Sequence, residues 1–267
     1  MAGQSRAGDF LQLGGKVAVV TGGGSGMGRA TALAMAEQGM RVAVGDINRE
    51  RAEETVELAR AVGGDAIAIE VDVSDAAAVR RLVATTVNHF GGLDCAANVA
   101  GIAPMEQSVA SLSEAMWRRI IDVNLTGPFF CLKEQAAAMA GKGGSIVIVA
   151  SIGALIGSPV QPAYVSSKHG VLGLARSAAL EFGAQGIRVN TLCPGFTRTP
   201  MTEAFFGADF DAFASSATPL GRGGEPEEMA DAILWLCSPR SSFVNGATIV
   251  ADGGQMVGTG VPGSAKT

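Results

Sequence analysis

Short β-branched segments alternate with longer segments of helical periodicity along the whole chain. The strand-like runs are 16–20, 41–46, 65–73, 93–99, 144–150, 187–193 and 247–251. Helical candidates lie near 27–39, 49–62, 75–90, 113–139, 163–182 and 226–238. Parallel neighbours in a sheet need crossover connections, which are usually helices. The alternation therefore predicts an α/β fold in which seven parallel strands are covered by helices on both faces.

The pattern predicts one domain over residues 13–257, because no Pro/Ser-rich linker interrupts it and 267 residues suit a single core. We expect a flexible N-terminal arm over 1–12 and a Gly-rich flexible tail over 258–267. The interval 196–224 has no strand pattern and is predicted to be an irregular substrate lid. It contains five phenylalanines, at 196, 205, 206, 210 and 213, which either cover an apolar substrate or dock the lid on the body.

Composition narrows the function classes. The chain is 48% hydrophobic and 17% charged, with a net charge of −5, so nothing favours binding to nucleic acid or an anionic membrane. No apolar run is long enough for a membrane span, and the N-terminus lacks a secretory pattern, which predicts a cytoplasmic protein. Four widely spaced cysteines and only two histidines argue for reduced thiols and no metal site.

A glycine-rich stretch, "TGGGSGMG" at 21–28, stands between the first strand and the first helix. Such a loop brings backbone N–H groups and a helix N-terminus close to a phosphate. Asp46 ends the second strand, 18 residues beyond Gly28, where a carboxylate can bind both ribose hydroxyls and repel a 2′-phosphate. This favours NAD, while Arg49 leaves NADP use open. The alternative is a glycine turn beside a solvated aspartate.

Tyr164 is the only tyrosine of the chain, and Lys168 follows it by four residues. In a helix the two side chains share one face, about one turn apart. At ~4 Å and an effective dielectric of ~20, the ammonium charge is worth roughly 4 kcal/mol, or about three units of the phenol's pKa. This would bring Tyr164 towards the range of efficient acid–base catalysis. The alternative is an ordinary helical residue beside a solvated lysine, and His169 points away from Lys168.

These features together resemble the short-chain dehydrogenase/reductase superfamily, over about residues 13–254. The loop matches the family's Thr-Gly-x-x-x-Gly-x-Gly pattern, and "NVAG" at 98–101 matches its Asn-Asn-Ala-Gly motif except for Val99. "DVNLTG" supplies Asn124, and Ser151, Tyr164 and Lys168 have the family's spacing. "PGFTRTP" resembles the segment near the nicotinamide, and "ADGG" at 251–254 resembles the usual ending. The fold implied is a Rossmann-type doubly wound sheet.

The resemblance implies that Asn124, Ser151, Tyr164 and Lys168 are catalytic. Tyr164 would exchange a proton with the substrate oxygen while hydride moves between the nicotinamide and the carbon. Ser151 would bind that oxygen, Lys168 would bind the ribose, and Asn124 would order a water chain. The expected cofactor-binding residues are Thr21, Gly22, Ser25, Gly26, Met27, Gly28, Asp46, Ile47, Asp72, Val73, Asn98, Ala100, Gly101, Tyr164, Lys168, Pro194, Gly195, Thr197 and Thr199. The expected substrate residues are Ser151, Gly153, Gln161, Tyr164, Phe196 and Phe205.

The main interpretation is an NAD-dependent dehydrogenase acting on a neutral secondary alcohol or ketone. One alternative is an NADPH-preferring carbonyl or 3-oxoacyl-carrier-protein reductase, and another is a non-catalytic dinucleotide-binding sensor or scaffold. The predicted helix 163–182 carries Gly170, Gly173 and Ser177 on one side, where small residues permit close approach by another element. That element could be the chain's own sheet. Because members of the family commonly pair this helix between subunits, we expect a homotetramer, with a dimer second.

Overall fold

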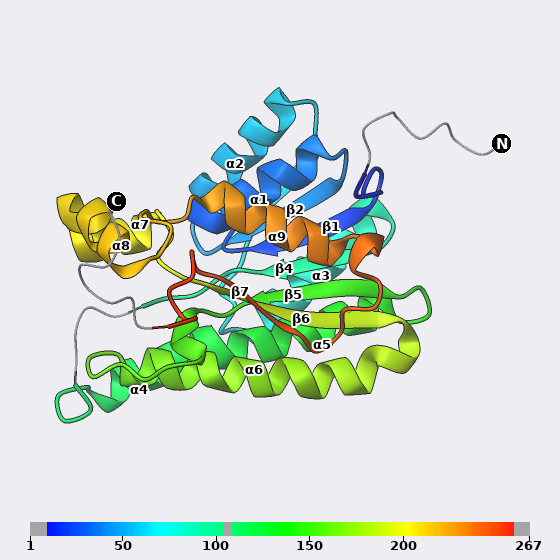
Figure 1. The fold of residues 1–267 in the computed structure, drawn as a ribbon. Coiled ribbons are helices and arrows are strands. Elements are labelled where there is room, and N and C mark those ends of the chain that lie inside the picture. The colour runs from blue at the N-terminus through cyan, green and yellow to red at the C-terminus, as the bar shows by residue number, and fades with distance from the viewer. Residues whose placement is uncertain (1–9, 104–107, 259–267) are drawn as a thin grey trace.

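Seven parallel strands form one sheet in the order β3-β2-β1-β4-β5-β6-β7 (Figure 1). The structure is a computed structural model that describes residues 10–103 and 108–258. The strands are β1 (Val17–Thr21), β2 (Arg41–Asp46), β3 (Asp65–Glu70), β4 (Cys95–Asn98), β5 (Gly144–Val149), β6 (Ile187–Pro194) and β7 (Thr248–Ala251). Five of these strands, β1, β2, β4, β5 and β6, consist only of buried and half-buried residues, because helices cover both faces of a parallel sheet. The predicted Rossmann-type fold is confirmed.

Helices cover both faces of this sheet. The α-helices are α1 (Gly26–Glu37), α2 (Arg49–Ala61), α3 (Ala76–Phe90), α4 (Glu114–Ile121), α5 (Gly127–Met139), α6 (Pro162–Phe182), α7 (Pro200–Phe206), α8 (Phe210–Ala217) and α9 (Pro226–Cys237). Short 3-10 turns are η2 (Ile152–Ala154), η3 (Gly183–Gln185), η4 (Gly207–Asp209) and η5 (Pro239–Ser241). One apolar core joins the sheet to α1, α2 and α9, and a second joins it to α3, α5 and α6 (Figure 1).

The strand order reverses between β1 and β4, which are direct neighbours although β2 and β3 lie between them in sequence. Beyond this point the loops that follow β1 and β4 separate, and such a crevice at the carboxyl ends of the strands is where open α/β sheets bind ligands. The glycine-rich loop follows β1, and the "NVAG" segment begins at the end of β4. The fold therefore brings both motifs to one place.

The structure corrects two predicted elements. The helix expected over 113–139 is interrupted by one π-helical turn, η1 (Asp122–Thr126), which carries Asn124 between α4 and α5. The interval 196–224 is not irregular throughout, because it contains α7, η4 and α8. These helices have only seven and eight residues and are separated by Gly207, whose φ of 50° ends α7. Helices this short leave too few turns for a readable periodicity.

At the N-terminal end of the described chain, Phe10 contacts η5. Its carbonyl oxygen accepts a hydrogen bond from Arg240 Nε at 2.9 Å, and the guanidinium lies 4.4 Å from the ring centroid. The rest of the predicted arm, residues 1–9, lies outside the described residues. The same holds for residues 259–267 of the predicted tail.

Candidate active site

The glycine-rich loop makes a turn that only glycine can form at two positions. Gly22 has a φ of 68°, a left-handed conformation that favours glycine. At Gly28, a Cβ atom would lie 2.0 Å from the Gly22 carbonyl oxygen, so no side chain fits there. The loop leads into α1, whose N-cap Ser25 makes no side-chain capping bond and whose first turn has no acidic residue. A phosphate group fits this helix N-terminus.

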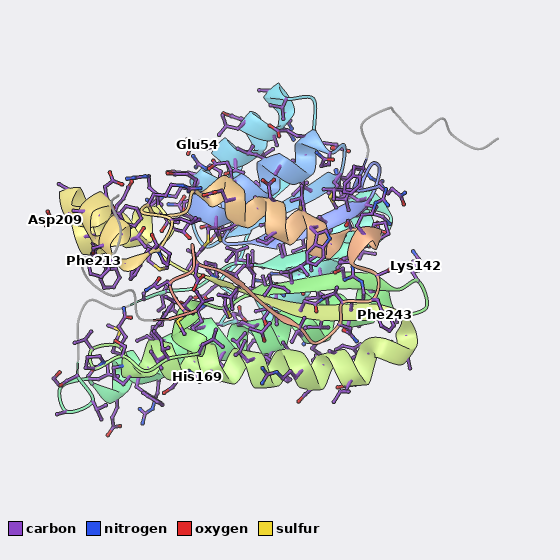
Figure 2. All side chains as sticks on the ribbon, in the orientation of Figure 1. Glu54, Lys142, His169, Asp209, Phe213 and Phe243 are labelled. Carbon is purple, nitrogen blue, oxygen red and sulfur yellow. The ribbon has the colours of Figure 1, made fainter. Side chains whose placement is uncertain are left out.

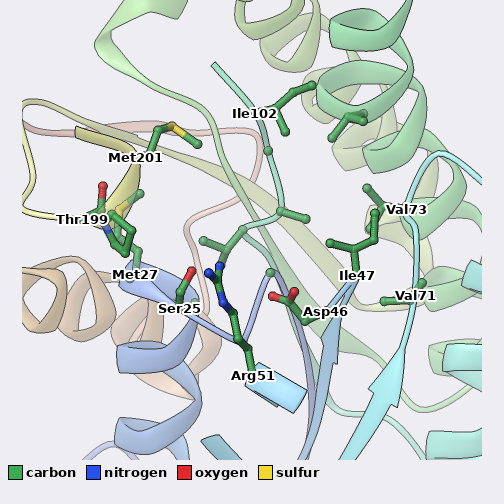
Figure 3. A pocket seen from close by; sticks show the side chains of 18 of the residues that line it. Ser25, Met27, Asp46, Ile47, Arg51, Val71, Val73, Ile102, Thr199 and Met201 are labelled. Carbon is green, nitrogen blue, oxygen red and sulfur yellow. The ribbon is translucent and has the colours of Figure 1, made fainter. Parts of the chain in front are cut away.

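Asp46 faces this loop from the end of β2. Its two carboxylate oxygens accept hydrogen bonds from the backbone N–H groups of Gly24 and Asn48, each at 2.9 Å. These bonds fix the carboxylate and leave further lone pairs for ribose hydroxyls. Arg51 lies beside it, and Figure 3 shows the guanidinium between Ser25 and Asp46. Arg51 forms no hydrogen bond or ion pair through its side chain with any residue that the structure describes.

Arg51, and not Arg49, is therefore the arginine that lies beside Asp46 in this cavity. Arg49 is exposed and pairs with Glu53 at 2.8 Å, one helical turn away in α2. The sequence prediction named Arg49, which is nearer to Asp46 in sequence. Which arginine side chain points towards the loop depends on the exact residue at which α2 begins. Asn48 caps the helix by accepting a hydrogen bond from Arg51 N, which sets that start.

A cavity of about 270 Å³ extends along this crevice (Figure 3). Twelve of the residues predicted to bind the cofactor line it: Gly22, Ser25, Gly26, Met27, Gly28, Asp46, Ile47, Asp72, Val73, Ala100, Gly101 and Thr199. The remaining lining residues include several that sequence reasoning missed, namely Arg51, Val71, Val99, Ile102, Arg119, Val123, Pro200 and Met201. These residues fit a dinucleotide, because the backbone N–H groups at the start of α1 can bind phosphate and the adjacent Asp46 carboxylate can accept bonds from ribose hydroxyls.

Seven predicted cofactor residues do not line this cavity: Thr21, Asn98, Tyr164, Lys168, Pro194, Gly195 and Thr197. Thr21 Oγ1 accepts a hydrogen bond from Ala100 N at 3.3 Å, and Thr197 Oγ1 donates to the Gly195 carbonyl oxygen at the same distance. Pro194 ends β6. Asn98 is buried in β4, and its amide exchanges two hydrogen bonds with Gln135 of α5, at 2.8 and 2.9 Å.

Asp72 lines the cavity with its carboxylate already engaged. Ser74 donates to it from both backbone and side chain, and Arg119 lies 3.4 Å away. Burial acts to raise the pKa of Asp72, but the bonds from Ser74 and the charge of Arg119 outweigh it, and the pKa lies below its ordinary value. The carboxylate is thus ionised and oriented by these two partners.

The four predicted catalytic residues meet beyond β4 and β5. Asn124 belongs to η1 and Ser151 precedes η2, whereas Tyr164 and Lys168 both belong to α6. A Cβ at Gly153 would lie 3.4 Å from both Ser151 Oγ and Tyr164 Cε1, so these two side chains flank Gly153. A Cβ at Gly101 would lie 3.3 Å from Asn124 Oδ1 and 3.5 Å from Lys168 Nζ. Gly101 also lines the cavity of about 270 Å³, so the cluster adjoins that cavity.

Backbone hydrogen bonds orient two members of this cluster. The Asn124 amide accepts from Ile102 N and donates to Ile102 O, both at 2.8 Å, which ties the π-helical turn to the loop after β4. Ser151 Oγ accepts from Gly153 N at 3.0 Å. The local change to π-helical bonding is what turns Asn124 towards this loop, and π-turns are frequent at functional sites.

The structure contradicts the predicted lowering of the phenol's pKa. Burial raises the pKa of Tyr164 above its ordinary value, and hydrogen bonding with Ser151 counteracts this only in part. Lys168 Nζ lies 5.6 Å from the Tyr164 ring centroid and donates to Val149 O at 2.9 Å. Burial also lowers the pKa of Lys168 to about 8. The Lys168 ammonium is therefore directed partly to the Val149 carbonyl oxygen. Burial of Tyr164 raises the pKa of the phenol by more than this ammonium lowers it.

A second cavity, of about 320 Å³, opens on the other side of Tyr164. All six predicted substrate residues line it: Ser151, Gly153, Gln161, Tyr164, Phe196 and Phe205. Gly195, Met201, Phe206 and Gln255 also contribute, and none of the described residues that line this cavity is charged. Met201 of α7 lines both cavities, so the two spaces share one wall.

The phenylalanines predicted for the lid fall into two groups by position. Phe196, Phe205 and Phe206 line the second cavity. Phe213 stacks on Phe206 with 4.5 Å between ring centroids, and Phe210 is buried, so these two hold α8 against α7 (Figure 2). His169 lies on the exposed side of α6, where its ring contacts the Val165 carbonyl oxygen (Figure 2).

Two negative findings concern the described ranges only. Within 10–103 and 108–258, no group of three or more metal-ligating side chains is close enough together to hold a metal ion. In the same ranges, no helix has the length and apolar character that crossing a bilayer requires.

Comparison with known proteins places this geometry in a family. A family model described as enoyl-(acyl carrier protein) reductase matches residues 22–256. The 2,5-dichloro-2,5-cyclohexadiene-1,4-diol dehydrogenase of Sphingobium indicum is 44% identical over 246 residues, covering 91% of this chain and 97% of the relative. Cyclohexanol dehydrogenase of an Acinetobacter species is 43% identical over 239 residues, covering 89% and 94%.

A solved structure agrees with these sequence matches. A short-chain type dehydrogenase/reductase from Mycobacterium marinum superposes with a TM-score of 0.88 at 36% identity, covering 93% of this chain and 98% of the other. The fold and these relatives define an oxidoreductase from a family whose members generally use NAD(P)(H). The chain belongs to the short-chain dehydrogenase/reductase superfamily.

Proposed function

We propose that this protein reduces neutral cyclic ketones, or oxidises the corresponding secondary alcohols, with NAD(H) as its cofactor. The second cavity carries this proposal. One of its sides presents Ser151 and Tyr164, and the other presents aromatic and aliphatic side chains of the lid, with no charged group among the lining residues that the structure describes. A neutral apolar ring suits such a wall. The names of the two curated relatives, which refer to cyclic alcohols, support the same class.

The proposed roles follow from the positions of the side chains. A bound dinucleotide supplies or accepts the hydride. Ser151 donates a hydrogen bond to the substrate oxygen, and Tyr164 donates its proton as negative charge develops there. Because burial keeps the phenol protonated, Tyr164 is in the form that ketone reduction requires. Lys168 and Asn124, next to Gly101, hold the ribose side of the site and connect it to solvent.

We propose NAD(H) because Asp46 is fixed where a 2′-phosphate would be repelled. Arg51 favours the alternative, an NADPH-preferring reductase, because its unpaired guanidinium stands beside the same position. The two cofactors are therefore assayed in parallel.

The test is ketone reduction with NADH and NADPH, using cyclic, aryl and aliphatic ketones together with a 3-oxoacyl thioester. Tyr164→Phe is expected to bind NADH as the wild type does, while kcat falls roughly 100-fold or more because proton donation is lost. His169→Phe, on the exposed side of the same helix, is the matched control. Wild-type turnover by Tyr164→Phe would contradict the mechanism. NADH binding without turnover of any ketone would favour a sensor, and a strong preference for the thioester would favour a carrier-protein reductase.

A further inference from the structure

Gln255 is a cavity residue that the roles described above do not use. It lies just beyond β7 and lines the same cavity as Ser151 and Tyr164. Its side-chain oxygen, Oε1, is buried and has no hydrogen-bond partner. Among the buried side-chain oxygen and nitrogen atoms of the described residues, this is the only one without a partner. Native proteins satisfy nearly all such atoms, so an exception beside a binding cavity points to a ligand.

The turn that carries Gln255 is fixed by several contacts. Asp252 accepts hydrogen bonds from the backbone N–H groups of Gly254 and Met256, at 2.9 and 2.8 Å. Gly253 and Gly254 have φ values of 63° and 87°, which favour glycine. Asp252 also packs against Gly195, where a Cβ would lie 2.8 Å from Asp252 Cα. The position of Gln255 is thus set by the fold, and it is the next residue after the "ADGG" segment.

A glutamine in this state is ready to bind a polar group. Leaving a buried acceptor unpaired is unfavourable, and no internal hydrogen bond has to break before a ligand can form one. The terminal torsion of a glutamine side chain is soft, so the amide can turn its oxygen towards a nearby donor. The complementary partner of Oε1 is a hydroxyl or N–H donor.

We propose that Gln255 is a specificity residue that accepts a hydrogen bond from a hydroxyl group of the substrate remote from the reacting carbon. This rests on the proposed function and makes its substrate class narrower. The site takes a cyclic ketone that carries a second, hydroxyl-bearing ring carbon, or the corresponding cyclic diol. Ser151 and Tyr164 bind the reacting oxygen, and Gln255 binds the other hydroxyl. An apolar ring between them contacts the phenylalanines of the lid.

The experiment compares ketones that differ only in the remote group. Initial rates give kcat/KM for 3- and 4-hydroxycyclohexanone, the matching methylcyclohexanones, and the matching methoxycyclohexanones, with the preferred nicotinamide cofactor. The methyl group keeps the shape but forms no hydrogen bond, and the methoxy group accepts but does not donate. For the wild type we expect the hydroxy ketone to exceed both others in at least one ring series.

Gln255→Met is expected to lower the ratio of hydroxy to methyl kcat/KM about tenfold, the worth of one hydrogen bond to a buried partner. Gln38→Met, at the end of α1, is the matched control and leaves the ratio unchanged. Gln255→Glu keeps an acceptor and removes the N–H donor, so it retains the preference for hydroxyl. Thermal unfolding shows whether each variant folds. If Gln255→Met does not fold, Gln255→Glu still tests the inference.

Several results overturn the inference. A purely structural role would lower kcat/KM for hydroxy and methyl ketones by the same factor, so that the ratio in Gln255→Met equals the wild-type ratio. An equal gain from the methoxy group, or a loss of the preference in Gln255→Glu, would show that the amide donates and does not accept. The methylcyclohexanones keep the two proposals apart. If the wild type reduces them and shows no Gln255-dependent preference, only this inference fails, whereas absence of all turnover refutes the proposed function as well.

Discussion

At the scale of single residues, the opposite charges of Asp46 and Arg51 face the same part of the cavity that the glycine-rich loop lines. Asp46 is held by two backbone N–H groups, whereas the Arg51 side chain has neither a hydrogen bond nor an ion pair with the described residues. A fixed carboxylate repels a phosphate strongly, but a free guanidinium on a long stem can reach one. We expect the balance between these two side chains to set whether the protein prefers NAD or NADP.

We predict that Arg51→Ala lowers kcat/KM for NADPH about tenfold and changes the value for NADH by less than about twofold, since only the 2′-phosphate contact is lost. Arg49→Ala is the control, because Arg49 carries the same charge but pairs with Glu53 at the surface. Steady-state rates with each cofactor measure both values. Equal losses with the two cofactors would show that Arg51 acts on the shared part of the molecule.

Lys168 is expected to make the free energy of unfolding rise with pH, whereas a lysine paired with an acid would make it fall. Burial lowers its pKa from an ordinary value of 10.5 to about 8. Below about pH 8 both the folded and unfolded states carry the proton, and the buried charge costs stability by a constant amount. Between about pH 8 and 10.5 the unfolded state binds more protons, so this lysine's contribution to the free energy of unfolding rises with pH.

We predict that replacing Lys168 with Met removes this rise. The wild-type free energy of unfolding minus that of Lys168→Met should increase by about 3 kcal/mol from pH 8 to 10.5, at about 1.4 kcal/mol per pKa unit. Urea unfolding at a series of pH values measures the difference, and Lys142→Met at an exposed position is the control. A flat or falling difference would mean that the lysine keeps its ordinary pKa in the folded protein.

At the scale of elements, the sequence predicts structure best where only one kind of residue can occupy a position. The strands of the sheet were predicted because buried parallel strands are continuous apolar runs, and the loop at 21–28 because its glycines admit no substitute at Gly28. The interruption of the helix at η1 was missed, because a π-turn adds one residue without changing the hydrophobic pattern enough to be seen.

The lid and the cavities show a second limit of sequence prediction. Helices α7 and α8 are stabilised by ring contacts between Phe196, Phe206 and Phe213, which come from three segments and become neighbours only in the fold. Arg51 and Gln255 were missed for a similar reason. Each is one polar residue among many in sequence, and only burial, neighbours and the missing hydrogen bond distinguish it. The four residues predicted as catalytic stood out because their spacing is specific.

At the scale of the whole molecule, the outer face of α6 is still free to meet another subunit. Gly170 does not serve this purpose, because a Cβ there would lie 2.8 Å from Leu125 of the same chain. Apart from its own helix backbone and chain neighbours, Gly173 has no described atom within 4 Å of its Cβ position, and Leu180 of the same helix is 87% exposed. An open glycine and a solvent-facing leucine on one helix favour the expected pairing between subunits.

We predict that Gly173→Leu reduces the assembly without disturbing the subunit. The leucine side chain has room in the isolated chain, and leucine is a better helix former than glycine. The unfolding temperature of the subunit should therefore not fall. Sedimentation should give a tetramer for the wild type and a smaller species for the variant. Gly258→Leu, which is also free of contacts, is the control. A wild-type monomer, or an unchanged mass for Gly173→Leu, would refute the pairing through this face.

The amide pair between Asn98 and Gln135 constrains how this family member can change over generations. Each side chain supplies both a donor and an acceptor to the other inside the core. A mutation at either position alone leaves a buried amide without a partner, which costs about 1–3 kcal/mol, whereas replacing both with apolar groups of similar shape can be nearly neutral. Drift at one of these sites is therefore tolerated only when the other site changes too, and the two positions should vary together among descendants of this sequence.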